Sequence, residues 1–334
     1  MAAKLTKSKI RAFHSELRKW YASHGRKDLP WRNTDDPYPI YISEVMLQQT
    51  QVKTVLERYY FPFLERFPSL TALAEAPEGD VLKRWEGLGY YNRAINLHKA
   101  AKQAQPKLPD SEEDLIALPG IGKNTARAVL AFGFHKPAAI LEANVKRVVH
   151  RIFALEKADD KTMWECAERL LDAEHPFDYN QAMMDIGAMV CTKTKPDCTA
   201  CPASGMCQGK AEPERYPAPK PKKAVPTHKR FLVIWEDEKG LIFLPKRESR
   251  HLNGLHGLPQ YDSREEIALE GYQPASLTTL GNIVHVYSHY RLEAEVLRAP
   301  YPHRSNQPDW IAKRAITKIA LSKADHKALA LIQS

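Results

Sequence analysis

Apolar residues recur at helical spacing through the first 210 residues of the chain. Two sets each fall on one helical face: Ile10, Phe13, Leu17, Trp20 and Tyr21, then Ile42, Val45, Val52, Leu56 and Tyr59. The segment from Ser111 to Leu115 has the spacing of a capping box, with Ser111 at the N-cap and Asp114 three residues later. Residues 1–210 are therefore predicted to be mainly helical.

The pattern changes after residue 210. Residues 211–228 are rich in proline and lysine and nearly free of large aliphatic side chains, which predicts a semi-rigid linker. Beyond it, three β-rich runs are broken by Gly, Asp and Pro, at 230–235, 240–247 and 281–297. A helical pattern at 322–332 closes the chain. Residues 229–334 are therefore predicted to form a second, α+β domain.

Composition narrows the class of protein. The chain has 334 residues and 43% hydrophobic content, enough for two or three soluble domains with a sizeable core. No apolar run is long enough to span a bilayer and the first ten residues contain no apolar signal segment, so a cytoplasmic protein without membrane contact is expected. The net charge of +9 favours a polyanionic partner such as nucleic acid.

Four of the five cysteines lie close together, with the spacing Cys191-x6-Cys198-x2-Cys201-x5-Cys207. In a chain without a secretory signal, such a cluster indicates metal ligation instead of disulfides. Only one C-x2-C pair is present, and the uneven spacing suits a [4Fe–4S] cluster better than a zinc ion, which stays open as the alternative. Cys166 lies in a helical pattern and is predicted to be a core residue.

A glycine-rich turn joins two predicted helices at 118–132. Gly120 and Gly122 permit positive φ and close approach of another backbone. The helix that begins near Lys123 would direct free N–H groups at whatever lies before it, which suits a DNA phosphate. An ordinary turn between two helices is the alternative, and the basic chain and the cysteine cluster favour DNA.

One carboxylate precedes a predicted amphipathic helix. In "LEANVKRV" (141–148), Glu142 follows an apolar run, Asn144 is a candidate N-cap, and the apolar positions Val145, Val148, Val149 and Ile152 follow at helical spacing. Glu142 is either an acid that interacts with the helix dipole or a catalytic group, and the spacing alone does not decide between them.

These features together resemble a known family. The hairpin "LPGIGKNTARAV", the carboxylate some twenty residues later and the cysteine spacing resemble the endonuclease III superfamily of DNA glycosylases. The stretches "LPWR" (29–32), "SEVMLQQTQV" (43–52), "GLGYYNRAINLH" (87–98) and "NQAMMDIGAMVC" (180–191) are similar to the MutY-type adenine DNA glycosylases. The resemblance runs from about residue 8 to the C-terminus.

The resemblance implies a fold and a function. It implies a six-helix barrel at about 30–136, a helical iron–sulfur domain from about 1–29 plus 137–210, and a Nudix-like domain at 229–334. The implied activity is removal of adenine mispaired with 8-oxoguanine or guanine in double-stranded DNA, by a monomer located with the nucleoid. A [4Fe–4S] cluster is the implied cofactor, held by Cys191, Cys198, Cys201 and Cys207.

Residue roles follow from the same resemblance. Glu44 matches the general acid that protonates adenine, and Glu142 stands where the family usually has a catalytic Asp, in Glu-Ala-Asn for the usual Asp-Gly-Asn. Leu29, Trp31 and Gln181 match the adenine pocket. Asn124 also belongs to this implied pocket, and it occupies the position that carries a nucleophilic lysine in bifunctional relatives, which implies a monofunctional enzyme.

Other matching positions contact DNA. Gln49 and Tyr90 match residues that wedge into the duplex, and Gly120, Gly122 and Lys123 match a contact with the DNA backbone. In the second domain, Tyr287-Ser288-His289 stands where the family commonly shows Phe-Ser-His, the reader of 8-oxoguanine. The Glu-rich helix of Nudix hydrolases does not occur at its usual spacing, so this domain is expected to bind without hydrolysing.

Two other functions remain open from the sequence. A bifunctional glycosylase and lyase for damaged pyrimidines is disfavoured by Asn124 and by the second domain. A lesion-binding protein with weak catalysis is kept open by Glu142, because its extra methylene group changes the reach of the carboxylate.

Overall fold

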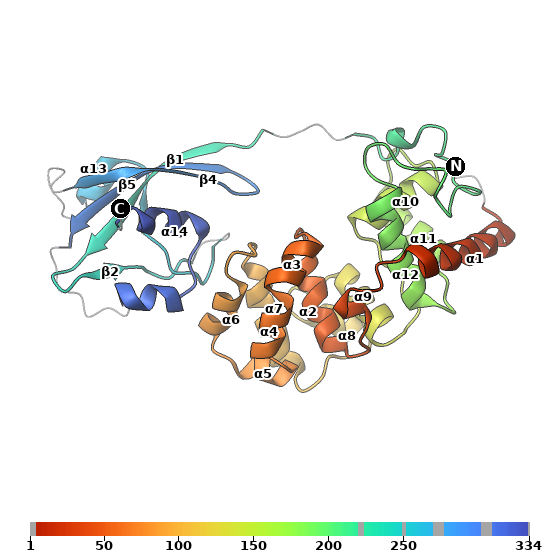
Figure 1. Ribbon diagram of the computed structural model, residues 1–334, viewed down its shortest axis with the longest axis horizontal. Helices are drawn as coiled ribbons and strands as arrows, with labels where there is room; N and C mark the ends of the chain where they lie inside the picture. The colour runs from red at the N-terminus through yellow and green to blue at the C-terminus, as the bar shows by residue number, and fades with distance from the viewer. Residues whose placement is uncertain (1–4, 220–223, 249–251, 270–276, 302–308, 333–334) are drawn as a thin grey trace. The chain divides into compact units, whose positions relative to one another are not determined.

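The computed structural model describes residues 5–219, 224–248, 252–269, 277–301 and 309–332. The chain divides into two compact units, one made of 1–52, 69–71 and 100–221, the other of 53–68, 72–99 and 222–334. The mainly helical first part and the α+β second part agree with the sequence (Figure 1). No helix among the described residues is long and apolar enough to cross a membrane.

The first unit is built from helices. They are α1 (Lys7–His24), α2 (Pro37–Leu47), α8 (Glu112–Ala117), α9 (Lys123–Gly133), α10 (Ala143–Ile152), α11 (Asp160–Leu170) and α12 (Pro176–Asp185), with α5 (Leu70–Glu75) and α7 (Asn92–Ala104) shared with the second unit. The predicted N-cap of α8 is present, with the Ser111 hydroxyl accepting from the Asp114 N–H at 3.1 Å. One core joins the apolar face of α1 to residues 139–206 and contains Cys166, as predicted.

The helical face predicted from Ile42 to Tyr59 is interrupted. Helix α2 ends at Leu47 and α3 (Val52–Arg58) begins after a turn in which Gln49 has φ of 56°. Left-handed backbone is costly for a residue with a side chain, and it cannot continue a right-handed helix. The apolar spacing gave no sign of this turn, because α2 and α3 each bury apolar side chains.

The second unit combines short helices with one mixed sheet. The helices of its first part are α3, α4 (Tyr60–Arg66) and α6 (Glu78–Trp85), with most of α7. The strands are β1 (Thr227–Glu236), β2 (Leu241–Phe243), β3 (Gln260–Tyr261), β4 (Thr278–Val286), β5 (Arg291–Pro300) and β6 (Trp310–Ala312). Their order is β4-β5-β1-β2-β6, with β3 also paired to β1.

The sheet carries a helix on each face. One face packs against α14 (Lys323–Ala330) and the other against α13 (Arg264–Leu269), as the two apolar clusters of this unit show. Strands β4 and β5 are antiparallel, and β5 is parallel to β1. The three β-rich runs and the closing helix were predicted, whereas β3 and β6 were not, because two or three residues are too few to show a period.

Candidate active site

A cleft of about 520 Å³ lies in the first unit, between the end of α2 and the starts of α9 and α10. Two of its lining residues are the predicted catalytic carboxylates Glu44 and Glu142. The complete lining is Glu44, Leu47, Gln48, Gln49, Asn124, Thr125, Ile140, Leu141, Glu142, Ala143, Lys146 and Met184. Folding therefore brings together acids from two distant segments of the chain.

The two carboxylates differ in their tendency to hold a proton. Burial and the nearby charge of Glu142 raise the pKa of Glu44 to about 8, against an opposing effect of Arg32. Burial also raises the pKa of Glu142, but both Arg26 and Arg32 act to lower it. Paired acids whose environments separate their pKa values can act as proton donor and as anion in the same site.

Both arginines are held by one buried acid that the sequence analysis did not single out. Asp185, at the end of α12, is fully buried and accepts hydrogen bonds from Arg32 Nη1 and Nη2 at 2.7 and 2.9 Å and from Arg26 Nε at 2.7 Å. Burial opposes ionisation, yet these bonds lower the pKa of Asp185 overall. One feature of the sequence could have identified Asp185, because it is the single acid within an apolar run. A carboxylate that is buried there requires a charged or hydrogen-bonding partner.

The position of Glu142 corrects one expectation about α10. The helix begins at Ala143 with Glu142 as its N-cap, whereas Asn144 was predicted to be the cap. Asn144 instead accepts from Arg147 within the helix at 3.1 Å. The Glu142 side chain makes no capping hydrogen bond to the helix N–H groups, and Glu142 lines the cleft.

Asn124 lines the cleft from the start of α9 and also braces it. Its Oδ1 accepts from the backbone N–H of Leu141 at 2.7 Å, one residue before Glu142. Gln48 donates to the Thr125 hydroxyl at 3.3 Å and joins α2 to the same helix. These two contacts tie the segments that carry Glu44 and Glu142 to α9.

The other residues predicted for the adenine pocket are buried beside this region. Leu29 and Trp31 are 5% and 4% exposed, and Gln181 is 2% exposed. None of the three lines the cleft among the described residues. The Gln181 Oε1 atom has no hydrogen-bond partner in the described part of the chain. A buried polar atom without a partner in an active-site region is suited to accept a hydrogen bond from a ligand.

The predicted DNA contacts occupy exposed turns. Gln49 has φ of 56° and Tyr90 has φ of 51°, and the Tyr90 side chain is 39% exposed. Gly120 has φ of 75° in the turn before α9, and Gly122 is the N-cap of α9, which no side chain caps within the described residues. Lys123 is the first residue of that helix, and its ammonium lies 4.4 Å from the centre of the Trp164 ring.

All four clustered cysteines line one cavity at the end of α10. They are Cys191, Cys198, Cys201 and Cys207. Burial and then the charges of the other three raise the pKa of Cys201 to about 12. Arg151 donates to Cys191 Sγ at 3.2 Å. Across the described residues, no group of three or more His, Cys, Asp or Glu side chains is arranged so that it could hold a metal ion. Four thiols that line one cavity are the ligand type that iron–sulfur clusters use.

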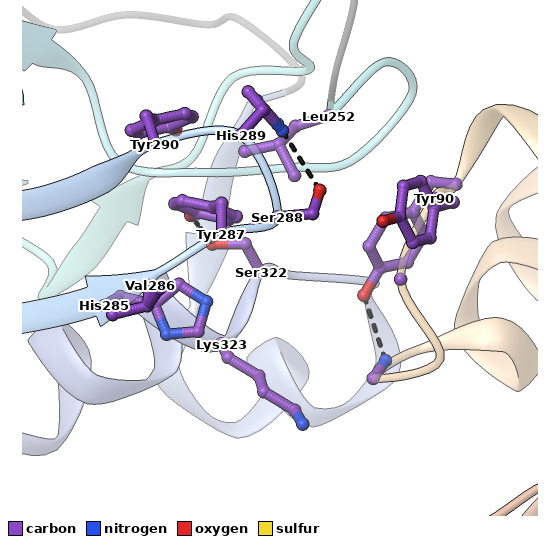
Figure 2. Close-up of a pocket in the computed structure, with 13 residues that line it drawn as sticks. Tyr90, Leu252, His285, Val286, Tyr287, Ser288, His289, Tyr290, Ser322 and Lys323 are labelled. Carbon is purple, nitrogen blue, oxygen red and sulfur yellow. Dashed lines mark hydrogen bonds between the residues drawn. The ribbon is translucent and has the colours of Figure 1, made fainter. Parts of the chain in front are cut away.

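A second cavity, of about 260 Å³, lies within the second unit. Figure 2 shows Tyr90 on the turn before α7, facing Tyr287 and Ser288 on the turn between β4 and β5. His289 lies beside Ser288, with its Nδ1 atom 3.3 Å from the Ser288 hydroxyl. The three residues predicted to read 8-oxoguanine therefore line a cavity together with the predicted wedge Tyr90.

Two family models match the chain. Residues 42–171 match the HhH-GPD superfamily of base excision DNA repair proteins, and residues 230–331 match the NUDIX domain. The first match covers both carboxylates and the glycine turn. The second covers the sheet and α14.

Relatives in bacteria and mammals match most of the chain. An adenine DNA glycosylase of Buchnera aphidicola is 38% identical over 265 residues, which are 76% of this chain and 75% of the relative. A human adenine DNA glycosylase is 32% identical over 73% of this chain and 50% of its own length. A thymine-DNA glycosylase of Aeropyrum pernix is 35% identical over 61% of this chain and 96% of its own.

Solved structures agree on the fold of the helical part. A thermostable thymine-DNA glycosylase covers 63% of this chain and all of its own at 31% identity, with a TM-score of 0.58. Endonuclease III in a non-covalent DNA complex has a TM-score of 0.54 at 21% identity, covering 64% of this chain and 100% of its own, which establishes the fold alone. The chain is a DNA glycosylase that belongs to the adenine DNA glycosylase family, within the HhH-GPD superfamily of base excision DNA repair proteins.

Proposed function

We propose that the chain removes adenine mispaired with 8-oxoguanine or guanine in double-stranded DNA, by acid-assisted hydrolysis of the N-glycosidic bond. The observation that carries this proposal is the pair of carboxylates in one cleft, where burial and Glu142 raise the pKa of Glu44 to about 8. Adenine leaves poorly unless it is protonated, and the sugar gains positive charge as the bond breaks. A proton donor meets the first requirement, and an anion near the sugar meets the second.

Glu44 is the proposed acid, and it would protonate adenine at N7. Glu142 is the proposed anion, and it would stabilise the oxocarbenium-like sugar. Arg26 and Arg32 favour the charged form of Glu142, while its charge favours the protonated form of Glu44. The extra methylene of Glu142 is compatible with this role, since its carboxylate lines the cleft and makes no capping bond.

The target base must leave the duplex to reach this cleft. We propose that the unpartnered Gln181 oxygen accepts from the exocyclic amine of adenine, and that Leu29 and Trp31 form the apolar wall. Gln49 and Tyr90, exposed in tight turns, would fill the space that the base leaves in the duplex. Gly120, Gly122 and Lys123 would hold the backbone through the start of α9.

The second domain is proposed to read the opposite base. Tyr287, Ser288 and His289 line a cavity large enough for contacts with a base edge. The hydroxyl of Ser288 is exposed and can exchange hydrogen bonds with an oxidised purine. The proposed domains remain 1–210, with a barrel at about 30–136 and an iron–sulfur part at about 1–29 plus 137–210, then a linker at 211–228 and the reader at 229–334.

The proposed cofactor is a [4Fe–4S] cluster held by Cys191, Cys198, Cys201 and Cys207. It would link the chain through four thiolates and so stiffen the loop that follows α12. Gln208 and Gly209 donate from that loop to the backbone of α10 at 3.1 and 2.8 Å. The same helix begins at Glu142, so the loop supports the helix whose other end reaches the cleft.

We propose that the enzyme is a monofunctional, monomeric glycosylase that works on DNA in the cytoplasm. Asn124 is an amide already hydrogen bonded to Leu141, and an amide cannot form a Schiff base. The similarity to a thymine-DNA glycosylase makes thymine the competing base.

The test compares base release from duplexes containing A:8-oxoguanine, A:G and G:T, each with and without alkali. Release of adenine with strand breaks that appear only after alkali supports the proposal. Release of thymine, breaks without alkali, or tight binding without release would each contradict it. Borohydride should trap no covalent adduct between the enzyme and the A:8-oxoguanine duplex.

A further inference from the structure

The turn between α6 and α7 in the second unit is held in a demanding conformation. Gly87, Gly89 and Tyr90 have φ of 90°, 82° and 51°. The Tyr91 hydroxyl accepts from the Gly87 N–H at 3.0 Å, and the Trp85 indole donates to the Gly89 carbonyl at 3.1 Å. This turn presents the exposed Tyr90, the proposed wedge.

The start of α14 is anchored in the sheet part of the same unit. Ser322 caps the helix and donates to Asp325 Oδ2 at 2.5 Å. Asp325 is fully buried and also accepts from Arg247 Nη2 at 2.7 Å and from the Leu258 N–H at 3.0 Å. Ser322 therefore has a fixed position relative to the sheet.

The turn that reads the opposite base contacts the same serine. The Tyr287 hydroxyl donates to Ser322 Oγ at 3.4 Å, and its ring stacks on Tyr290 with 4.6 Å between centroids. The turn from Tyr287 to Tyr290 is thereby connected to the start of α14.

Glu86 connects the wedge turn to this anchor. It is the last residue before Gly87, and its Oε1 accepts from the Leu321 N–H at 2.9 Å and lies 2.7 Å from His326 Nε2. Its Oε2 accepts from Lys83 Nζ at 2.5 Å. Lys83 also donates to the Ile319 carbonyl at 3.0 Å. One carboxylate thus connects the base of the Tyr90 turn to the residue next to Ser322.

We propose that Glu86 is a positioning residue for recognition of the opposite base. It holds the Tyr90 turn against the start of α14, so that Tyr90 and the Tyr287–Ser288 turn keep the spacing seen across their shared cavity (Figure 2). Chemistry occurs in the cleft of the first unit, to which Glu86 contributes no side chain. The inference rests on the proposed function and specifies which residue sets the preference for 8-oxoguanine over guanine.

The experiment measures affinity and single-turnover rate on A:8-oxoguanine and A:G duplexes for the full chain and for Glu86→Ala. The expected result is a loss of affinity for A:8-oxoguanine of roughly ten-fold, which is the typical effect of removing one hydrogen bond to a charged group. The A:G affinity and both saturating single-turnover rates should stay near the wild-type values. Glu86→Gln, which keeps an acceptor for the Leu321 N–H, should restore part of the preference.

The matched control is Asp80→Ala. Asp80 lies on the same helix as Lys83 and pairs with Arg66 at 2.8 Å in an exposed ion pair, so its loss should leave the preference unchanged. An unchanged preference in folded Glu86→Ala, or an equal loss on both duplexes, would overturn the inference. A wild-type chain without preference for 8-oxoguanine would instead overturn the proposed function itself, so the two failures can be told apart.

Discussion

The side-chain oxygen of Asn124 accepts a hydrogen bond from the backbone N–H of Leu141 at 2.7 Å. The Asn124 amide therefore serves as a brace between two segments of the chain. The bond joins the first turn of α9 to the residue that precedes Glu142. This bond therefore connects the segment that carries Glu142 to the glycine turn, which is proposed to hold DNA.

Removing this brace should slow catalysis without abolishing DNA binding. Asn124→Ala leaves the Leu141 N–H without its acceptor, and Glu142 is no longer fixed relative to Glu44. A displaced catalytic group commonly costs about 10²-fold in rate, so we expect a large fall in single-turnover rate and little change in duplex affinity. Wild-type kinetics in this variant would show that Leu141 needs no brace.

The activity should depend on pH through both carboxylates. Because burial and Glu142 raise the pKa of Glu44 to about 8, the acid keeps its proton at neutral pH and loses it as pH rises through that value. The second-order rate constant kcat/KM for the free enzyme should therefore fall roughly ten-fold per pH unit above about 8. On the acidic side, the raised pKa of Glu142 predicts a fall as that group becomes protonated.

A kcat/KM profile on the A:8-oxoguanine duplex checks this prediction. Glu44→Gln should be inactive at every pH, because an amide N–H is far too weak an acid to protonate adenine. A wild-type profile that stays level to pH values well beyond the pKa of Glu44 would mean that another group supplies the proton.

The catalytic rate should depend more on the charge of the Glu142 side chain than on the length of that side chain. Glu142→Gln keeps the shape but removes the anion facing the sugar, and we expect at least a 10²-fold loss of single-turnover rate with binding retained. Glu142→Asp keeps the charge and should retain measurable activity. Equal rates for Glu142→Gln and wild type would remove Glu142 from the mechanism and leave it as the N-cap of α10 alone.

The cysteine cavity should give the purified protein a colour. A cubane cluster predicts a yellow-brown protein that absorbs at about 400 nm, with iron and no stoichiometric zinc by metal analysis. Cys201→Ser should reduce both the absorbance and the iron content. Cys166→Ser is the matched control, because Cys166 lies in the apolar core and does not line the cavity, so its absorbance should match wild type. Zinc in place of iron would contradict the prediction.

The sequence predicted the parts of the fold that have a strong local signal. Long apolar periods identified the helical part, β-rich runs identified three segments of the sheet, and the N-cap at Ser111 was confirmed. The break at Gln49 was missed because the turn carries no glycine or proline. Asn144 was a reasonable cap by residue preference, but the N-cap of α10 is Glu142, two residues earlier.

The site was predictable only where a motif marked it. Glu44, Glu142 and the four cysteines were named from the sequence, and their roles stay predictions. The contacts of Asp185 with Arg26 and Arg32 link residues that are far apart along the chain. A single acid in an apolar run marks Asp185, but no local pattern identifies Arg26 and Arg32 as its partners. The same holds for Glu86 and Leu321.

The core that joins α1 to residues 139–206 has a consequence for synthesis. Helix α1 leaves the ribosome well before residues 139–206, which cover its apolar side, so an interval separates the helix from its packing partners. At about 5–20 residues per second, that interval lasts on the order of ten seconds or more. During it, Phe13, Leu17 and Tyr21 are exposed, which makes the nascent first helix a natural client for a chaperone.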